Sequence, residues 1–308
     1  MATTINIGTH DGVFHADDVL AVALIKQNYI ASNCNDFIFN IIRSRKPEVL
    51  EECQWIVDVG GMDMVDVGHV CFDHHQKDSE SYPNGIKMAA CGKVARYLYN
   101  EQPELLDDLR ISCLYAVEAQ DNGQNLIDYD PENNYSNPFA WVRVMNINWD
   151  QDESLVQQRF EMAVDMAVNI VNQLIDRFTA TKKAEELLLS WIKSRQEGSP
   201  VLVMPRFVPW QNIICDWNTF NPNDKIYAVV FPAMGGGYNC QIVPATKGSF
   251  ELSCFFPPEW KGLKGIDLAN TSGLPSAIFC HPAGFISGWA FQEDAIKAAQ
   301  LATSWIVV

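Results

Sequence analysis

Strand-like and helix-like segments alternate through the first 120 residues, and this alternation restricts the fold more than any other feature of the chain. Apolar runs rich in β-branched residues are followed by segments whose apolar residues recur at helical spacing. Such alternation predicts βαβ units, a largely parallel sheet and therefore an α/β fold. In an open sheet of this kind the ligand site lies beyond the carboxyl ends of the strands. The strand-like runs are 5–8, 37–42, 55–59 and 70–72, and the helix-like segments are 17–28, 46–53, 87–100 and 105–120.

The second half of the chain has a different pattern. Residues 155–196 contain neither Gly nor Pro and are apolar at spacings of three and four, which predicts two long helices or one bent helix, broken near 179–182. Residues 201–308 contain strand-like runs with frequent Gly and Pro and a closing helix from 292 to about 305. The expected parts are therefore an α/β domain over 1–150, a helical connector over 151–198 and a smaller α+β domain over 199–308.

Four of the six histidines lie close to isolated aspartates in the first quarter of the chain. Imidazole and carboxylate groups together are ligands for Mn, Fe or Zn rather than for Ca or a thiolate site. These residues outnumber the ligands of one closed site, so two metals that share a bridging carboxylate are expected, as in a two-metal phosphoesterase. The histidines are His10, His15, His74 and His75, and the aspartates are Asp17, Asp58 and Asp73.

These residues are expected to converge on one rim of the sheet. His10 follows the first strand, Asp58 ends the third and Asp73 ends the fourth, while His15 and Asp17 lie at the start of a helix. A carboxylate such as that of Asp58, after a mostly apolar strand, is costly to bury unless it is paired or metal-bound. The convergence therefore predicts a single site.

The two histidines of the tripeptide Asp73-His74-His75 should have different roles, because adjacent side chains point to different sides. One histidine can bind metal and the other can donate to a substrate phosphate. Asp73 is suited to orienting an imidazole.

Several other polar residues have simpler explanations. Asp11 suits a turn with Gly12, and Asp18 suits the dipole at a helix start. Asp63 and Asp66 are expected in a solvated loop. Asp121 ends an amphipathic helix, where a turn role and metal binding are equally consistent with its position.

The net charge of −16, with a pI near 4.7, argues against long duplex nucleic acid as a partner, because no basic stripe is present in the sequence. A short phosphate-bearing substrate can still bind, because two divalent cations reverse the local sign of a carboxylate-rich site.

Compartment and redox state follow from other features of composition. The nine cysteines are scattered and lack CxxC spacing, which predicts reduced, mostly buried thiols and no Cys-based zinc site. No apolar run is long enough to span a bilayer, and the first residues lack the pattern of a signal peptide. We expect a cytoplasmic protein without a membrane partner. The sequence leaves open whether the protein forms a homodimer.

The order of a His-rich motif, an isolated Asp, DHH and a later Asp resembles the DHH phosphoesterase superfamily. Within it, GTHDGVFHADDVLA, RSRKPEVLEECQWIVDVGG, FDHHQ and AQDNG closely resemble the melanocyte proliferating gene family of exonucleases. VPWQN, GLPSAIFCHPAGFISG and the closing helix also match in character, so the resemblance covers nearly the whole chain.

This resemblance implies a doubly wound DHH domain, a smaller second domain and Mn-dependent 3′–5′ exoribonuclease activity. It implies two divalent cations, with Mn as the usual metal and Mg, Co, Fe or Zn as alternatives. The implied ligand roles are His10 and His15 on one metal, Asp17 and His74 on the other, and Asp58 and Asp121 bridging or flanking both. His75 would face the substrate phosphate, which makes His75 and Asp73 the catalytic candidates.

The second domain departs from the family pattern at residues 287–295, where a run similar to GGHxTxEGA is expected and the chain reads SGWAFQEDA.

We expect a 3′–5′ exonuclease acting on short RNA or DNA ends. The alternatives are a phosphatase for a nucleotide bisphosphate or pyrophosphate, and a catalytically weak nucleotide- or metal-binding regulatory protein. The substrate-binding candidates are His75, Arg43, Arg45, His281 and Gly288, and Lys77 and Lys261 are further cations that could contact phosphate.

Overall fold

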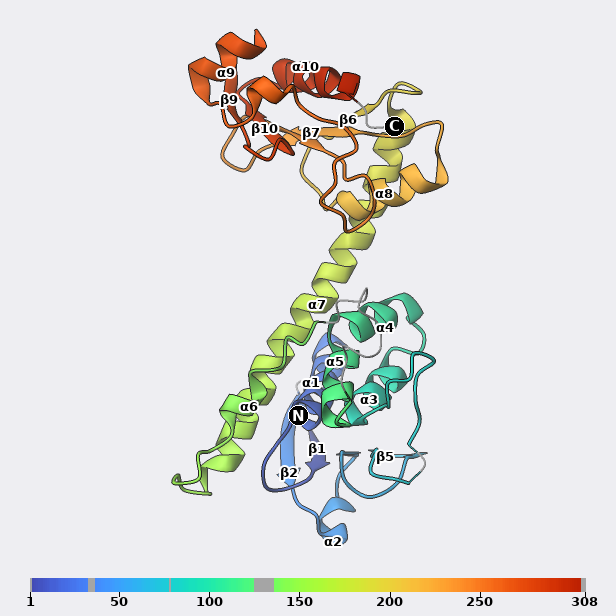
Figure 1. The fold of residues 1–308 in the computed structure, drawn as a ribbon. Coiled ribbons are helices and arrows are strands. Elements are labelled where there is room, and N and C mark those ends of the chain that lie inside the picture. The colour runs from blue at the N-terminus through green and yellow to red at the C-terminus, as the bar shows by residue number, and fades with distance from the viewer. Residues whose placement is uncertain (1, 33–36, 78, 125–135, 306–308) are drawn as a thin grey trace. The chain divides into compact units, whose positions relative to one another are not determined.

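The computed structural model describes residues 2–32, 37–77, 79–124 and 136–305 and separates into two compact units, Met1–Phe178 and Thr179–Val308 (Figure 1). Among the described residues, no helix is both long enough and apolar enough to cross a membrane. The eight described cysteines are buried free thiols, in agreement with the expectation; Cys34 lies outside the described residues.

The first unit is built on a five-stranded sheet with the order β2-β1-β3-β5-β4. Its strands are β1 (Thr3–Thr9), β2 (Phe37–Arg43), β3 (Trp55–Val57), β4 (Met64–Asp66) and β5 (His69–Phe72). The neighbours β2, β1, β3 and β5 pair in parallel, and β4 is an antiparallel edge strand. The expected α/β fold with a largely parallel sheet is confirmed. The edge strand was not expected, so Asp66 lies in a strand rather than in a loop.

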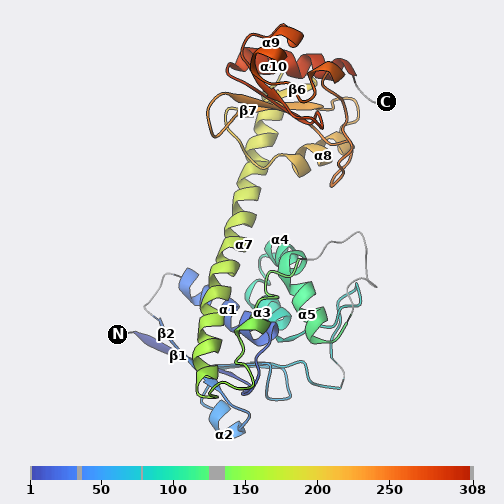
Figure 2. The same cartoon turned by 60° about the vertical axis from the view of Figure 1, so that its left-hand side comes forward.

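A nearly fully buried helix, α1, forms the centre of this unit. Its apolar residues from Val19 to Ile25 are no more than 1% exposed, because helices α3 and α5 pack against it (Figure 2). The helices of this unit are α1 (Ala16–Ala31), α2 (Pro47–Leu50), α3 (Ala90–Leu98), α4 (Pro103–Leu109), α5 (Tyr115–Asp121) and α6 (Val142–Met145), with a π-helical turn at Arg110–Leu114.

Helix α7 (Leu155–Ser194) is one continuous helix of 40 residues. The break expected near residues 179–182 is absent. A helix ends only where its hydrogen-bond ladder is interrupted, and these residues include neither Gly nor Pro. The domain limits 1–150, 151–198 and 199–308 stay predictions.

The second unit contains a mixed sheet with the order β6-β7-β8-β10-β9. Only the β6–β7 pair is parallel among the described pairings of this sheet. Helix α10 packs on β7 and β8. The strands are β6 (Val201–Val203), β7 (Ala228–Pro232), β8 (Tyr238–Ile242), β9 (Ala277–Cys280) and β10 (Ile286–Trp289), and the helices are α8 (Gln211–Phe220), α9 (Gly265–Ser272) and α10 (Gln292–Ala302).

Candidate metal centre

The turn from β1 into α1 brings two histidines and an aspartate together. His10 follows β1 directly, and its Nε2 lies 3.2 Å from Oδ2 of Asp18 in the first turn of α1. The other oxygen of Asp18 accepts the backbone N–H of His15 at 2.9 Å, which satisfies a donor at the helix start. Asp18 was expected only to serve the helix dipole. It also contacts His10 because the turn folds back over the end of β1.

Asp17 points the other way, toward the start of α3. Its two carboxylate oxygens accept the backbone N–H groups of Ala90, at 3.0 Å, and Cys91, at 2.7 Å. The side chain is fully buried, and Oδ2 lies 3.9 Å from Nε2 of His74. The start of α3 therefore fixes the position of this carboxylate.

Asp58 occupies the middle of the cluster. Its Oδ2 is 3.3 Å from Nε2 of His10, and its Oδ1 is 3.1 Å from Nε2 of His74. Its φ of 57° is the one positive value among the described non-glycine residues. Such a backbone conformation costs about 1–3 kcal/mol and is typical of functional sites.

Asp73 holds the DHH turn in place. One carboxylate oxygen accepts the backbone N–H of His74 at 2.7 Å and lies 2.7 Å from Nδ1 of His75, while the other accepts the N–H of Gly61 at 2.6 Å. One oxygen thus contacts both histidines of the turn, and the other is held by the backbone of Gly61. These contacts suit the expected role of orienting an imidazole.

The two histidines of the turn differ in environment, as expected for adjacent side chains. The His74 ring is 6% exposed, and its Nε2 lies 3.1 Å from both Asp58 and Asp121. The His75 ring is 61% exposed, with Nδ1 3.6 Å from Asp58. Asp121, at the end of α5, also lies 3.8 Å from Nδ1 of His15, so the structure places it within the cluster.

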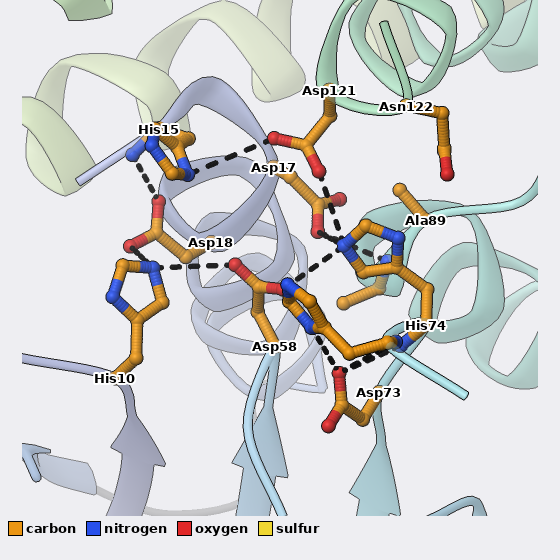
Figure 3. Close-up of polar contacts among 12 residues, drawn as sticks. His10, His15, Asp17, Asp18, Asp58, Asp73, His74, Ala89, Asp121 and Asn122 are labelled. Atoms are coloured by element: carbon orange, nitrogen blue, oxygen red, sulfur yellow. Dashed lines mark hydrogen bonds and ion pairs between the residues drawn. The ribbon is translucent and has the colours of Figure 1, made fainter. Parts of the chain in front are cut away.

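The ligand atoms form three neighbouring groups, in each of which all atoms lie within 4.8 Å of one another (Figure 3). Asp58 belongs to the first and second groups, and His74 belongs to the second and third. A carboxylate such as that of Asp58 can bridge adjacent cations through its two oxygens, whereas Nε2 of His74 can bind one cation. The groups are His10, His15 and Asp58; Asp58, His74 and His75; and Asp17, His74 and Asp121.

The donor set fits a divalent cation. Nε2 of His10 lies 3.2 Å from Oδ2 of Asp18, and Nε2 of His74 lies 3.1 Å from Oδ1 of Asp58, yet none of these four buried atoms has a hydrogen bond of acceptable geometry among the described residues. Buried polar atoms without hydrogen bonds are costly. A cation held between them would satisfy them, and mixed imidazole and carboxylate ligands suit Mn, Fe or Zn.

Without a cation, the cluster retains protons. Burial alone lowers the pKa of His10, but Asp18 and Asp58 outweigh this effect and raise it to about 10. Burial likewise lowers the pKa of His74, which Asp121 and Asp58 raise to about 11. A divalent cation would take the place of these protons.

A buried lysine holds the Asp73-His74-His75 turn in place through hydrogen bonds. Lys93 of α3 is 2% exposed, and its Nζ donates to Oδ2 of Asp63 and to the backbone carbonyl of Asp73, both at 2.6 Å. Asp63 in turn accepts the backbone N–H of Asp73 at 3.2 Å. Asp63 is therefore bound rather than merely solvated, and the sequence contained no signal that Lys93 would be buried.

Glu118 of α5 provides a second buried carboxylate at the start of α3. One of its oxygens accepts the N–H of Ala89 at 3.0 Å and the hydroxyl of Tyr82 at 3.2 Å. A Cβ atom on Gly92 would lie 1.8 Å from the same oxygen. The close approach of α3 and α5 thus depends on a glycine at this position.

The basic residues proposed as substrate contacts have partners within the protein. The guanidinium of Arg43 donates to the Gly12 carbonyl at 2.8 Å and stacks 4.7 Å from the ring centre of Phe160. Nε of Arg45 lies 3.2 Å from a carboxylate oxygen of Asp11, and this side chain is 62% exposed. The substrate-binding roles of Arg43 and Arg45 stay predictions.

The remaining substrate candidates lie in the second unit. Nδ1 of His281 accepts the backbone N–H of Ala283 at 3.1 Å. A Cβ atom on Gly288 would lie 2.5 Å from the ring of Phe279, so packing within the sheet explains this glycine. In the divergent segment, the buried Ser287 accepts the indole N–H of Trp289 at 2.9 Å. The substrate-binding roles of His281 and Gly288 stay predictions.

Comparison with known proteins gives one family. The family model described as MYG1_exonuc, Uncharacterised protein family (UPF0160), matches residues 6–303. The MYG1 protein of Chlamydia trachomatis is 28% identical over 306 residues, which cover 96% of each chain. The MYG1 exonuclease of Homo sapiens is 28% identical over 324 residues, covering 96% of this chain and 84% of the human protein.

Among solved structures, the crystal structure of RecJ in complex with Mn2+ from Thermus thermophilus aligns at 15% identity with a TM-score of 0.29. The alignment covers 97% of this chain and 52% of RecJ, so the chain spans about half the length of that protein.

Proposed function

Because the chain belongs to the MYG1_exonuc family, we propose that it is a divalent-metal-dependent phosphoesterase that removes nucleotides from the 3′ ends of short RNA or DNA. The family inferred from the sequence motifs is thereby confirmed. A hydrolase of this class agrees with the name exonuclease that the human and mouse relatives carry and with the metal-binding geometry of the first unit.

One observation carries the proposal: the carboxylate of Asp58 lies between two sets of candidate ligands, with Oδ2 3.3 Å from Nε2 of His10 and Oδ1 3.1 Å from Nε2 of His74. Two cations held by these side chains would supply Lewis acidity and an activated water for in-line attack on phosphorus. We infer that Mn is preferred, with Mg, Co, Fe or Zn as alternatives, because the donors are imidazoles and carboxylates.

The residues around the ligands have roles of their own. The exposed ring of His75 can reach a phosphoryl oxygen, and its Nδ1 is held 2.7 Å from Asp73. With Nδ1–H directed at that carboxylate, Nε2 must carry the second proton of an imidazolium to donate to the phosphate. The resulting positive charge would stabilise negative charge that develops on the phosphoryl group. Asp73 keeps the ring in this orientation.

Metal content measured together with activity tests the dinuclear site. After dialysis against Mn, the wild-type protein should approach about two equivalents per chain. Asp58→Asn should lose bound Mn and at least about 100-fold in rate, since even the loss of an outer hydrogen-bond partner costs about 10–100-fold. Asp66→Asn in the exposed strand β4 is the matched control and should leave both unchanged. A wild-type protein fully active with one equivalent contradicts the dinuclear model.

A substrate panel tests the reaction class. Oligonucleotides labelled at the 5′ end should give a ladder shortened from the 3′ end, with mononucleotides as products. The same assay with a nucleoside 3′,5′-bisphosphate and with pyrophosphate separates an exonuclease from a small-molecule phosphatase. Faster turnover of either small phosphate than of every oligonucleotide would reject the exonuclease proposal.

A further inference from the structure

A cavity of about 310 Å³ adjoins the ligand cluster. His15 and Asp121 line it and also belong to the ligand groups, so the cavity and the candidate centre share a wall. Its other walls come from α5 and from residues 139–146 around α6. Ligand pockets usually have volumes of about 300–1,000 Å³, so this cavity has room for one small ligand rather than for several linked units.

The cavity wall is fixed by hydrogen bonds that do not depend on a ligand. The amide of Asn146 accepts the Phe14 N–H at 3.0 Å and donates to the Phe14 carbonyl at 2.8 Å. Gln120 accepts the side-chain N–H of Asn137 at 2.8 Å. Side chains held in this way can position a ligand without first being ordered.

Arg143 is the single cation among the described residues that line the cavity. Its side chain is exposed, and no hydrogen bond or ion pair joins it to another described residue. Arg43 and Arg45, in contrast, are held by Gly12 and Asp11. In a chain with a net charge of −16, a guanidinium that has no partner among the described residues and lies on this cavity can bind an anion.

Building on the proposed function, we propose that this cavity is the subsite for the terminal nucleotide of the substrate and that Arg143 pairs with an anionic oxygen of its phosphate. Arginine forms strong charge-assisted hydrogen bonds with phosphate. The apolar side chains of Val13 and Ala140 on the cavity wall offer contact surface to the sugar or base. The substrate class is then a phosphate-bearing nucleoside, taken one unit at a time.

Calorimetric titration with adenosine 5′-monophosphate in the presence of Mn tests this subsite without requiring turnover. Arg143→Ala should weaken binding at least about tenfold, as expected for loss of a hydrogen bond to a charged group, and Arg143→Lys should recover part of it. Arg96→Ala is the matched control: it removes the same charge from a surface ion pair with Glu80 outside the cavity and should bind as the wild type does. Ala140→Trp, which narrows the cavity, should weaken binding of the nucleotide but not of inorganic phosphate.

The subsite and the proposed function can fail separately. Binding that depends on Arg143 in a protein that cleaves no oligonucleotide would reject the exonuclease and support the subsite. Cleavage of oligonucleotides by a protein whose nucleotide affinity is unchanged in Arg143→Ala would overturn the subsite alone. Absence of nucleotide binding to the wild-type protein would also overturn it.

Discussion

His74 and His75 are neighbours in the chain, yet their environments predict opposite phenotypes. His74 is buried between two carboxylates, each 3.1 Å away, whereas the ring of His75 is 61% exposed. His74→Ala should therefore lose bound Mn and activity together. His75→Ala should keep its Mn and lose about 100-fold in rate, the usual effect of removing one group that stabilises a developing negative charge.

Elemental analysis and initial rates on the same samples distinguish the two histidines. His69→Ala is the matched control, because it removes an imidazole from β5 that lies outside the ligand groups. Loss of Mn in His75→Ala would assign that ring to a metal and reverse the roles given to the pair.

Proton retention in the metal-free cluster predicts a pH dependence with a defined sign. Although burial opposes the shift, the pKa of His10 is raised to about 10 and that of His74 to about 11, whereas a histidine of the unfolded chain titrates near 6.5. Between about pH 7 and pH 10 the folded protein thus binds more protons than the unfolded chain, so the free energy of unfolding without metal falls as pH rises.

Bound Mn replaces these protons, so the increase in Tm caused by Mn should be larger at about pH 8 than at about pH 6.5. Melting curves with Mn and with a chelator at each pH measure this difference. An Mn-induced shift that is constant or shrinks with rising pH would contradict the assigned protonation states.

The sequence predicted which side chains converge on the candidate metal centre but not the side chains that support them. His10, Asp58 and Asp73 could be placed on one rim because they follow parallel strands. Lys93 could not, because its burial depends on Asp63, a residue 30 positions away. Arg143 could not be distinguished from other surface arginines, because its position on the cavity next to Asp121 arises only when α6 packs against α1.

At the scale of elements, the contact between α3 and α5 reverses the usual effect of a helix glycine. Gly→Ala inside a helix is ordinarily stabilising by about 1 kcal/mol. At position 92 the added methyl group would lie 1.8 Å from the buried Glu118 carboxylate and 2.6 Å from the Tyr82 hydroxyl. We expect Gly92→Ala to lower the free energy of unfolding by about 1–3 kcal/mol, as overpacking does. Urea denaturation measures the change.

The combination of Gly92→Ala with Glu118→Ala tests this cause. If steric overlap is responsible, the double variant should lose less stability than the sum of the two single variants. If the stability losses of the two single variants add up in the double variant, the effect of Gly92→Ala does not come from steric overlap with Glu118.

Other elements show where sequence patterns succeed and where they do not. β1 and α1 could be predicted because their apolar residues have distinct periods. β4 was missed because it has only three residues and all of them are exposed, so no face of it is buried to produce a pattern. In α7 the apolar pattern weakens near residues 179–182, but the backbone continues because hydrogen bonds within a helix do not require an apolar face.

The charge of the whole chain limits how it can bind nucleic acid. With a net charge of −16, and with Arg43 and Arg45 already bound within the protein, few cations are available for phosphates. We expect the Michaelis constant for single-stranded oligonucleotides to report about one to three phosphate contacts, which corresponds to a logarithmic salt slope of about −0.7 to −2 for the association constant. Rates should favour oligonucleotides of a few residues over long or duplex substrates.

Michaelis constants measured over a range of salt concentrations, with substrates of increasing length, check this expectation. A steep slope together with tight binding of long strands would require a basic surface formed by folding or by association of chains, which the linear sequence does not reveal.

The buried cysteine thiols can be used to detect local unfolding in each of the two units. Of the cysteines that the structure describes, four lie in Met1–Phe178 and four in Thr179–Val308. Burial raises the pKa of both Cys71 and Cys280 to about 11, so little reactive thiolate exists in the closed protein at neutral pH. Alkylation at each cysteine therefore has to wait for local unfolding, and mass spectrometry of the labelled peptides can rank the regions of both units by how often they open.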